Sequence, residues 1–478
     1  MSAADSPSAP AADSPSPSVA SAIELARRIR EREVSARATI ERTLTDIARR
    51  NPQSNAFTLV TGTRALAQAD AIDSALAHGR TLPPLAGVPF AVKNLFDIVG
   101  EVTTAGSRVN RTLPPAGADA VLIDRLTQAG AVLVGALNMD EYAYGFSTEN
   151  SHDGPARNPH DRRCIAGGSS GGSAAAIADN LVPLTLGTDT NGSIRVPASL
   201  CGIFGLKPTY GRLSRRGSFP FVTSLDHVGP FASNLEDLAL CYDLMQGPDP
   251  LDPACARQAA QPVGDSLVLG IGGLRIARLG GYFEQFSGPV ARQAVALACE
   301  ALGVSRQCEW PMAAAGRAAA FIITGAEGGA LHLANLRQRY DEFEPLSRDR
   351  FIAGCLTPAA WYQRAQRVRA VYARQVAEAF RDADIFLTAA TPTTAHPIGT
   401  EIIDINGQAM PARPSMGVLT QPVSCIGLPV LAAPVPVAGE LPIAIQIIAA
   451  PWRERDAFRV AAALVRAGVC RAPTPPTQ

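Results

Sequence analysis

The stretch from residue 167 to residue 212 carries the prediction of fold and function: it contains GGSSGGSAAAIA over 167–178 and GTDTNGSIRVPASLCGIFGLKPTYGR over 187–212. A run of glycine and serine is most often a flexible linker. Here the run leads directly into the helix-forming residues AAAIA, and apolar segments typical of strands lie on both sides. A linker does not suit the interior of such a core, so we interpret the segment as a functional loop.

The glycines of the first segment favour a binding loop. Glycine adopts backbone conformations that other residues avoid, so successive N–H groups can line a pocket at the start of a helix. Such a pocket suits an anion or an oxyanion. A nucleotide phosphate is disfavoured, because the pattern G-x-x-x-x-G-K-[ST] is absent and no lysine follows the glycines.

The second segment places a serine directly after several potential N–H donors. In GTDTNGSIRVP, Thr190, Asn191 and Gly192 precede Ser193. A serine nucleophile needs such donors near the carbonyl oxygen that becomes charged, and it also needs a base. Histidine is the usual base, but none of the six histidines lies in a recognisable hydrolase signature: His78, His152, His160, His227, His332 and His396.

Lys93 is the alternative candidate for the base. It interrupts the apolar run VPFAVKNLF (88–96). A lone lysine in such a run most often extends to the surface while its methylene stem stays buried. If the amine is buried instead, its pKa falls and the neutral amine can accept a proton. From these residues alone, both interpretations remain open.

Taken together, these segments resemble the amidase signature family. The run over 167–212 matches the family's defining stretch almost residue for residue, and three more segments are similar to it: GVPFAVKN (87–94), NMDEYAYGFSTENSHDGPARNP (138–159) and LPIAIQIIAAP (441–451). The resemblance extends roughly from Ala20 to Gly468. A motif of this length is far more specific than a short pattern.

The resemblance implies a catalytic triad. By position, Ser193 corresponds to the nucleophile, Ser169 to a bridging serine that the family holds through a cis peptide, and Lys93 to the base. Lys93 would take a proton from Ser169, which takes one from Ser193, and water would then hydrolyse the acyl-enzyme. The remaining implied site residues are the oxyanion-binding N–H groups of Thr190, Asn191, Gly192 and Ser193, and a substrate contact from Gly145 and Ser147. The resemblance implies neither a cofactor nor a metal.

Two residues depart from the family pattern without affecting the triad. Asn191 stands where the family often has glycine, and Ala166 where it often has proline. Asparagine tolerates a positive φ better than most residues, so the loop can keep its conformation. The Asn191 side chain could also add a donor near the substrate.

The fold that the resemblance implies is α/β: a single-domain α/β/α sandwich around a large mixed β-sheet. Local patterns also indicate alternating helices and strands. They predict helices over 20–50, 121–131 and 359–380, and strands over 85–99, 132–136, 267–276, 384–390, 427–436 and 441–448. We expect one amidase domain over residues 20–475, after a disordered tail over 1–19 that is rich in Ala, Ser and Pro.

Composition favours a cytoplasmic protein with a small-molecule substrate. Lys+Arg and Asp+Glu both number 43, so nothing in the net charge favours nucleic acid or an anionic membrane. No apolar run is long enough for a membrane span, and the N-terminal residues lack the features of a signal peptide. The 9 cysteines are scattered, with no C-x-x-C pattern and no zinc-type spacing, which predicts reduced thiols.

Within the family, three stretches are most similar to the branch of the carboxybiuret (biuret) hydrolases: RRGSFPFVTSLDHVGPFASN (215–234), SMGVLTQPVSCIGLPV (415–430) and IIAAPWRE (447–454). That branch implies ammonia release from a small urea-like carboxylate through an acyl-serine, and a small helical partner subunit in an oligomer. A carboxylate substrate needs a cationic partner. Arg337 and Arg339 are candidates, although arginines on a helix face are more often solvated.

Two alternative functions remain open. The first is the glutaminase subunit of a tRNA-dependent amidotransferase, because NMDEYAYGFSTEN (138–150) is similar to that branch too. Ammonia release from glutamine, compared with release from carboxybiuret, separates the two. The second is a non-catalytic scaffold of the same fold, against which the presence of Lys93, Ser169 and Ser193 argues. A fluorophosphonate that labels active serines tests that alternative.

Overall fold

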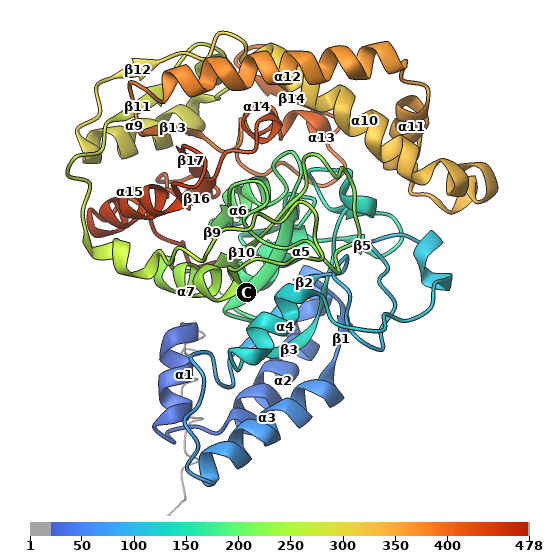
Figure 1. The fold of residues 1–478 in the computed structure, drawn as a ribbon, viewed down its shortest axis with the longest axis vertical. Coiled ribbons are helices and arrows are strands. Elements are labelled where there is room, and N and C mark those ends of the chain that lie inside the picture. Colours follow the sequence, from blue (N-terminus) through green and yellow to red (C-terminus); the bar gives the residue numbers. More distant parts are fainter. Residues whose placement is uncertain (1–20, 477–478) are drawn as a thin grey trace, which may run out of the picture.

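A computed structural model describes residues 21–476. An eleven-stranded mixed sheet forms its centre (Figure 1). Strands β2 and β8 pair in parallel, whereas β10 is antiparallel to both of its neighbours, β8 and β9. Across the sheet the strands are β1 (Phe57–Val60), β3 (Val132–Leu137), β2 (Pro89–Lys93), β8 (Leu184–Asp189), β10 (His227–Ala232), β9 (Phe204–Lys207), β16 (Val430–Pro434), β17 (Ala444–Ala449), β13 (Ile385–Ala389), β11 (Ile276–Leu279) and β12 (Gln307–Cys308).

Helices cover both faces of this sheet. The side chains of Phe90 and Val92 join one buried cluster while Ala91, between them, joins the other, as the two-residue period of a strand requires. One cluster includes residues of α4 (Val121–Gln128), α7 (Leu235–Met245), α9 (Pro289–Leu302) and α15 (Glu454–Arg466). The other includes residues of α1 (Ala22–Arg30), α2 (Ala36–Ser54), α3 (Gly62–Ala77), α5 (Gly171–Ala178) and α6 (Arg195–Cys201). The predicted α/β class with a large mixed sheet is confirmed.

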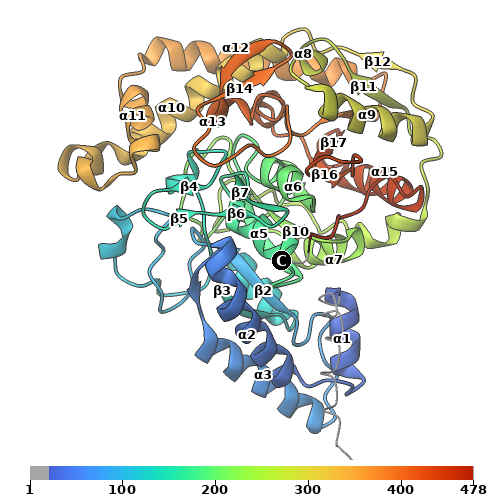
Figure 2. The same cartoon turned by 180° about the vertical axis from the view of Figure 1, so that it is seen from behind.

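The two ends of the molecule are helical. Helices α1, α2 and α3 lie at one end, and α10, α11 and α12 form a lobe at the other (Figures 1 and 2). That lobe comprises α10 (Ala313–Gln338), the short η4 (Tyr340–Glu342), α11 (Pro345–Cys355) and α12 (Ala359–Ala379). Shorter elements complete the chain: η1 (Val109–Thr112), η2 (Glu141–Ala143), η3 (Gly264–Val268), α8 (Tyr282–Gln285), α13 (Ala412–Ser415), α14 (Gln421–Cys425), and three small hairpins, β4–β5 (Glu149–Asn150, Gly154–Pro155), β6–β7 (Arg157–Asn158, Asp161–Ile165) and β14–β15 (Ile402–Ile405, Gln408–Pro411).

Two local predictions need correction. The helix predicted over 20–50 is two helices, since α1 ends at Arg30 and α2 begins at Ala36 after its capping residue Ser35. The strand predicted over 267–276 is wrong. Residues 264–268 form η3, the next residues form a turn in which Gly270 and Gly273 have positive φ, and β11 begins only at Ile276. Glycine supplies the turn that an apolar pattern alone does not reveal.

The other predicted helices and strands are present. The helix predicted over 359–380 is α12, and the strand predicted after it is β13. The two late strands are β16 and β17, which pair antiparallel. The predicted tail over 1–19 lies outside the described residues, and the domain boundaries 20–475 stay a prediction. No helix within residues 21–476 is long and apolar enough to cross a bilayer.

The sheet brings the segments that carry the three predicted catalytic residues together. Lys93 is the last residue of β2, and Asp189 is the last residue of the neighbouring parallel strand β8. The carboxyl ends of parallel neighbours lie at the same edge of a sheet, so the loops that follow meet there. The loop after β8 carries Ser193, and the loop before α5 carries Ser169.

Candidate active site

Lys93 is completely buried, so the interpretation as a surface lysine is wrong. Its Nζ donates hydrogen bonds to Ser169 Oγ at 2.7 Å and to Thr188 Oγ1 at 2.9 Å. Burial lowers the pKa of Lys93 to about 7, against the opposing charges of Asp140, Asp189 and Asp226. Near neutral pH a substantial fraction of Lys93 is therefore a neutral amine, which can accept a proton.

Ser169 follows a cis peptide bond, Gly168–Ser169. It is completely buried, and its hydroxyl accepts the hydrogen bond from Lys93. Glycine at position 168 is required by space, because a Cβ there would lie 2.1 Å from Asp140 Oδ2. The close packing of this loop fixes the hydroxyl beside the lysine.

Ser193 faces a small pocket from the loop between β8 and α6. It is 2% exposed, and its hydroxyl makes no hydrogen bond with another described residue. In particular, no hydrogen bond joins Ser193 to Ser169. The structure thus brings Lys93 and Ser169 into contact and places Ser193 at the pocket wall. The pocket is lined by Ala143, Tyr144, Gly145, Phe146, Thr190, Asn191, Ser193, Phe221, Phe321, Thr324, Arg350 and Gln421.

The Ser193 loop is held by a buried ion pair within its own motif. Asp189 accepts two hydrogen bonds from Arg195, from Nε and from Nη2, each at 3.0 Å, and neither side chain is exposed. Burial favours the neutral acid, but the charge and hydrogen bonds of Arg195 hold the pKa of Asp189 well below its usual range. Arg195 also donates to Gln446 Oε1 at 2.7 Å. The motif contains this Asp and Arg, but sequence reasoning assigned neither a role.

The predicted oxyanion-binding N–H groups differ in their availability. The Gly192 N–H donates to Asp189 Oδ1 at 2.7 Å, so it is engaged within the loop. The N–H groups of Thr190, Asn191 and Ser193 donate to no other described residue. The Asn191 side chain, expected to add a donor near substrate, donates instead to Thr324 Oγ1 at 2.8 Å, and both residues line the pocket.

Of the two predicted substrate contacts, Gly145 lines the pocket and Ser147 does not. A Cβ at Gly145 would lie 2.2 Å from Asp140 Oδ1, so only glycine fits there. Ser147 is completely buried, and its hydroxyl has no hydrogen-bond partner within the described chain. The role of Ser147 as a substrate contact stays a prediction.

Arg350 is the cation of the pocket, and no carboxylate is among the lining residues. Its guanidinium lies over the ring of Tyr144, 3.7 Å from the centroid, and donates to the Tyr144 carbonyl at 3.0 Å. The sequence candidates lie elsewhere: Arg337 is exposed, and Arg339 pairs with Glu342. Arg350 was missed because no local motif marks it; only the packing of α11 brings it to the pocket.

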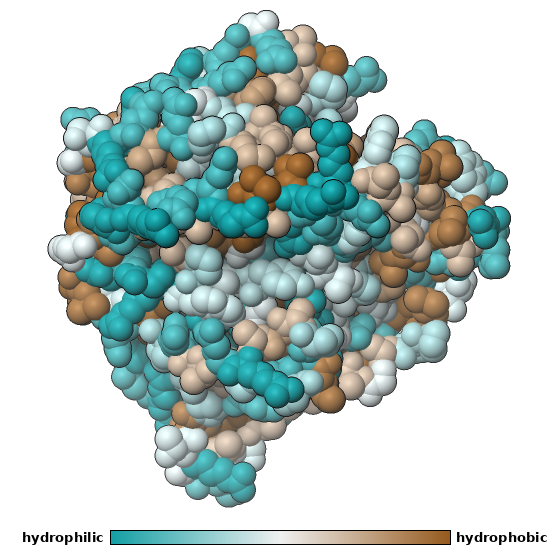
Figure 3. Space-filling view, turned by 45° about the horizontal axis from the view of Figure 1, so that its top comes forward, coloured by the Kyte–Doolittle hydropathy of each residue, from teal (hydrophilic) through white to brown (hydrophobic). Residues whose placement is uncertain are grey.

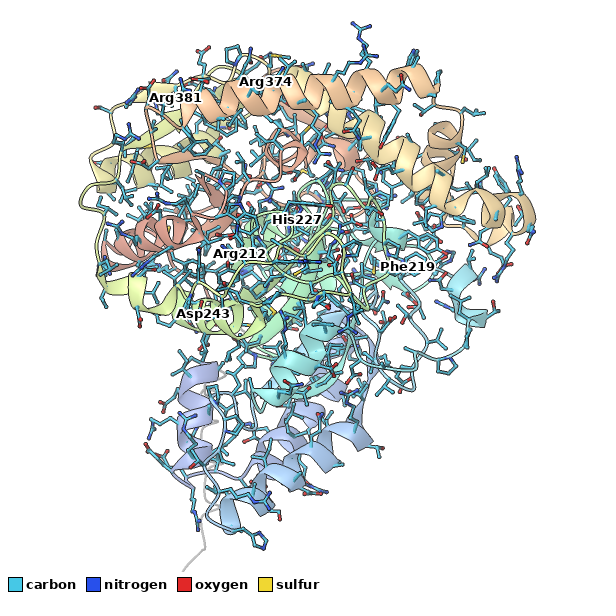
Figure 4. All side chains as sticks on the ribbon, viewed as in Figure 1. Arg212, Phe219, His227, Asp243, Arg374 and Arg381 are labelled. Carbon is cyan, nitrogen blue, oxygen red and sulfur yellow. The ribbon has the colours of Figure 1, made fainter. Side chains whose placement is uncertain are left out.

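None of the six histidines is hydrogen-bonded to Ser169 or Ser193. The nearest in the sheet, His227, is buried and lines a second cavity of about 290 Å³ beside Thr188 and Thr190 (Figure 4 labels His227). Its Nδ1 lies 2.6 Å from the carbonyl oxygen of Leu225 and 3.0 Å from that of Asp189. Burial holds the pKa of His227 well below its ordinary value. No cluster of His, Cys, Asp and Glu within residues 21–476 could hold a metal.

Comparison with known proteins identifies close relatives. Residues 38–457 match the family described as Amidase. The chain is 59% identical over 452 residues to AtzE, a 1-carboxybiuret hydrolase subunit of Pseudomonas sp. (strain ADP), covering 94% of this chain and 99% of that protein. It is 37% identical over 459 residues to a glutamyl-tRNA(Gln) amidotransferase subunit of Prochlorococcus marinus (strain MIT 9303), covering 90% and 93% of the two chains.

A solved structure has the same fold as this chain. It is described as an unexpected vestigial protein complex that reveals the evolutionary origins of an s-triazine catabolic enzyme. It matches this chain with a TM-score of 0.94 at 58% identity, covering 95% of this chain and 100% of that one. Because the family match covers most of the chain and the relatives span nearly all of it, the chain belongs to the amidase signature family and is an amidase, a hydrolase of C–N bonds.

Proposed function

We propose that this amidase hydrolyses a small urea-like amide that carries a carboxylate, 1-carboxybiuret or a close analogue, and releases ammonia. The observation that carries the proposal is the pocket beside Ser193, which contains one cation, Arg350, and no carboxylate. A guanidinium is well suited to bind a carboxylate through two hydrogen bonds. The 59% identity to the 1-carboxybiuret hydrolase protein AtzE supports the same substrate class.

In the proposed reaction, Ser193 Oγ attacks the terminal carbamoyl carbon. The Ser193 proton passes to Ser169 as the Ser169 proton passes to the neutral amine of Lys93. Rotation of the Ser193 hydroxyl or a bridging water closes the gap between the two serines. The C–N bond then breaks, the leaving nitrogen takes a proton from the same relay and departs as ammonia, and water hydrolyses the acyl-enzyme.

Backbone N–H groups stabilise the oxyanion in this mechanism. Those of Thr190, Asn191 and Ser193 donate to no other described residue and lie in the loop that the Asp189–Arg195 pair holds. Fixed donors of this kind stabilise the charge that develops on the carbonyl oxygen without reorganising in the transition state. The Gly192 N–H supports the loop through Asp189.

The pocket favours a compact substrate. Its free volume is about 10 Å³, the size of about one water molecule, so substrate enters only when lining side chains move. Phe321 is 48% exposed, so we propose that its side chain moves when substrate enters. A short polar amide requires a smaller displacement of these side chains than a long-chain amide does.

Glutamine is the second candidate substrate, because the chain is 37% identical to a tRNA-dependent amidotransferase protein. Glutamine carries an α-ammonium group as well as a carboxylate. Burying that ammonium without an anionic partner is unfavourable, and the pocket offers none. The proton relay from buried Lys93 would act in the same way on either substrate. Only the residues that line the pocket therefore distinguish glutamine from 1-carboxybiuret.

We further propose that the enzyme works in the cytoplasm with a small helical partner subunit, as an oligomer. Support comes from the relative solved as a protein complex and from apolar side chains on the lobe of α10 and α11 (at the right in Figure 3). Exposed apolar residues there are Phe321, Leu331, Leu333, Tyr340 and Leu346. Larger exposed apolar patches usually mark interaction surfaces.

The test is ammonia release from 1-carboxybiuret, biuret, glutamine, malonamide and a long-chain fatty amide, with and without a co-expressed partner subunit. We expect the highest kcat/KM with 1-carboxybiuret. A preference of about tenfold for the long-chain amide, equivalent to about 1.4 kcal/mol of transition-state binding, would refute the proposal. A preference for glutamine would assign the chain to the amidotransferase alternative.

A further inference from the structure

Arg413 joins the catalytic loops to a segment far along the chain. It lies in α13, directly after the β14–β15 hairpin, and its side chain is 14% exposed. Its Nη2 donates to Asp140 Oδ1 at 2.7 Å, and its Nη1 lies 3.8 Å from Glu344 Oε2. Both carboxylates are buried. No sequence motif or proposed catalytic step accounts for this group.

Asp140 packs against the loops that carry the serine site. Its Oδ2 accepts the Thr148 N–H at 3.0 Å, and its own N–H donates to the Ser169 carbonyl at 3.3 Å. A Cβ at Gly168 would lie 2.1 Å from this carboxylate and one at Gly145 would lie 2.2 Å from it. Asp140 therefore touches both the cis peptide before Ser169 and the glycine of the pocket.

Three carboxylates act on the charge of Lys93, and each has a different set of partners. Asp189 is paired with Arg195. Asp226 accepts hydrogen bonds from the Thr190 hydroxyl at 2.6 Å and from two backbone N–H groups, and burial raises its pKa. Asp140 has a single cationic partner within the described residues, Arg413. Of the three charges, that of Asp140 acts most strongly to raise the pKa of Lys93, although burial dominates and lowers it.

We propose that Arg413 is a positioning residue that keeps Lys93 a neutral base by serving as the counter-charge of Asp140. The inference rests on the proposed role of Lys93 as the base. Without Arg413, an unpaired carboxylate would remain buried beside the triad, which is strongly unfavourable. Retaining a proton on Lys93 would compensate that charge, and a protonated Lys93 cannot act as a base.

The other groups that face Arg413 do not account for the same effect. Burial raises the pKa of Glu344 to about 7. It is thus partly neutral at working pH and a weak partner at 3.8 Å. Glu149 and Arg350 also act on this cluster, with opposite charges. Because Glu344 itself titrates near neutrality, the experiment must separate it from Lys93.

The test is the pH profile of kcat/KM for 1-carboxybiuret in purified full-length enzyme, with its partner subunit if one is needed. In the wild type we expect activity to rise with pH through the pKa of Lys93. Arg413→Gln should move this rise to higher pH. A displacement of about one pH unit reduces the neutral fraction of Lys93 at pH 7 by about fivefold, and the loss should disappear near pH 9.

Three further variants make the result specific. Arg413→Lys keeps a cation near Asp140 and should shift the rise less. Asp140→Asn combined with Arg413→Gln removes both charges and should return the rise toward the wild-type pH; this pair also carries the test if Arg413→Gln does not fold. Glu344→Gln should still show the rise of kcat/KM with pH. As a control, Arg275→Gln removes a surface pair with Asp384 and should leave the profile unchanged.

The outcomes separate this inference from the proposed function. A loss in Arg413→Gln that is equal at every pH, or no displacement at all, overturns the role of Arg413 while leaving Lys93 as the base. If kcat/KM no longer rises with pH in Glu344→Gln, the titrating group is Glu344, and the proposed role of Arg413 is overturned as well. A wild-type profile without any rise removes Lys93 as the base, and this inference with it.

Discussion

Lys93 and Ser169 form a hydrogen bond of 2.7 Å between two completely buried side chains that are 76 residues apart in the chain. The bond joins the end of a central strand to a loop that contains a cis peptide. A buried amine with a pKa of about 7 beside a serine hydroxyl is suited to act as a base without histidine. This pair and the residues around it determine how the enzyme should respond to mutation and to pH.

Replacing the nucleophile should abolish activity without unfolding the protein. Ser193→Ala removes one hydroxyl that makes no hydrogen bond with another described residue, so the fold loses no hydrogen bond from it. We expect kcat to fall by more than about a hundredfold, as is usual for a lost nucleophile. Ammonia release and fluorophosphonate labelling measure the loss, and a thermal melt checks the fold. Retention of more than about one hundredth of the rate would contradict the assignment.

Ser169→Ala should be severe but less damaging than Ser193→Ala. It removes the only hydroxyl that links Lys93 toward the nucleophile, although a water can partly restore the proton path. The measurement is kcat for both variants under the same conditions. Thr188→Val is a matched control, since it removes the other hydroxyl bound to Lys93 and not the relay. Full activity in Ser169→Ala would show that the relay is wrong.

Activity should rise from acid to alkaline pH as Lys93 loses its proton. Only the neutral amine accepts a proton, so the rise should be centred near the lowered pKa of about 7 rather than near the ordinary lysine value. Lys93→Arg keeps the charge but cannot deprotonate, and it should be nearly inactive. The measurement is kcat/KM between about pH 6 and about pH 9 with the chemical step rate-limiting; a flat profile would refute the base.

Arg350→Gln should weaken catalysis on carboxylate substrates selectively. A hydrogen bond to a charged group contributes about 1.5–3 kcal/mol, so kcat/KM for 1-carboxybiuret should fall by about 10- to 150-fold. For uncharged malonamide the loss should be small. Arg339→Gln, which removes a pair with Glu342 outside the pocket, is the control. Equal losses on charged and uncharged amides would show that Arg350 supports the fold instead.

Removing Arg195 should destabilise the fold strongly. Arg195→Met leaves Asp189 buried and unpaired, and breaking such a pair costs about 3–5 kcal/mol. The partly exposed pair of Arg275 and Asp384 contributes about 0–1 kcal/mol, so Arg275→Met should change little. The denaturation midpoints of both variants in urea measure the difference. Similar midpoints would mean that the buried pair has no special importance.

Much of the site could be predicted because two of the three candidate catalytic residues lie in one contiguous motif. Ser169 and Ser193 lie in one stretch whose glycines, serines and following helix are recognisable locally, and Lys93 lies in a short apolar segment of its own. The alternation of apolar segments likewise predicted α12 and the strands β2, β3, β13, β16 and β17, but it did not predict β8, β9 and β10 at the centre of the sheet. It failed at 267–276, where the glycines at 270 and 273 turn the chain before β11 begins. Local periodicity does not encode such turns well.

By itself the sequence determined the family, the α/β class and the identity of the three candidate catalytic side chains, because these depend on contiguous residues. Only the tertiary structure decided whether Lys93 is buried, which arginine enters the pocket, and how each buried carboxylate is paired. Arg350 and Arg413 reach the site from segments more than 150 residues beyond Ser193, through the packing of α11 and α13. Burial and pairing of charges depend on which remote segments pack together, and no local pattern specifies that packing.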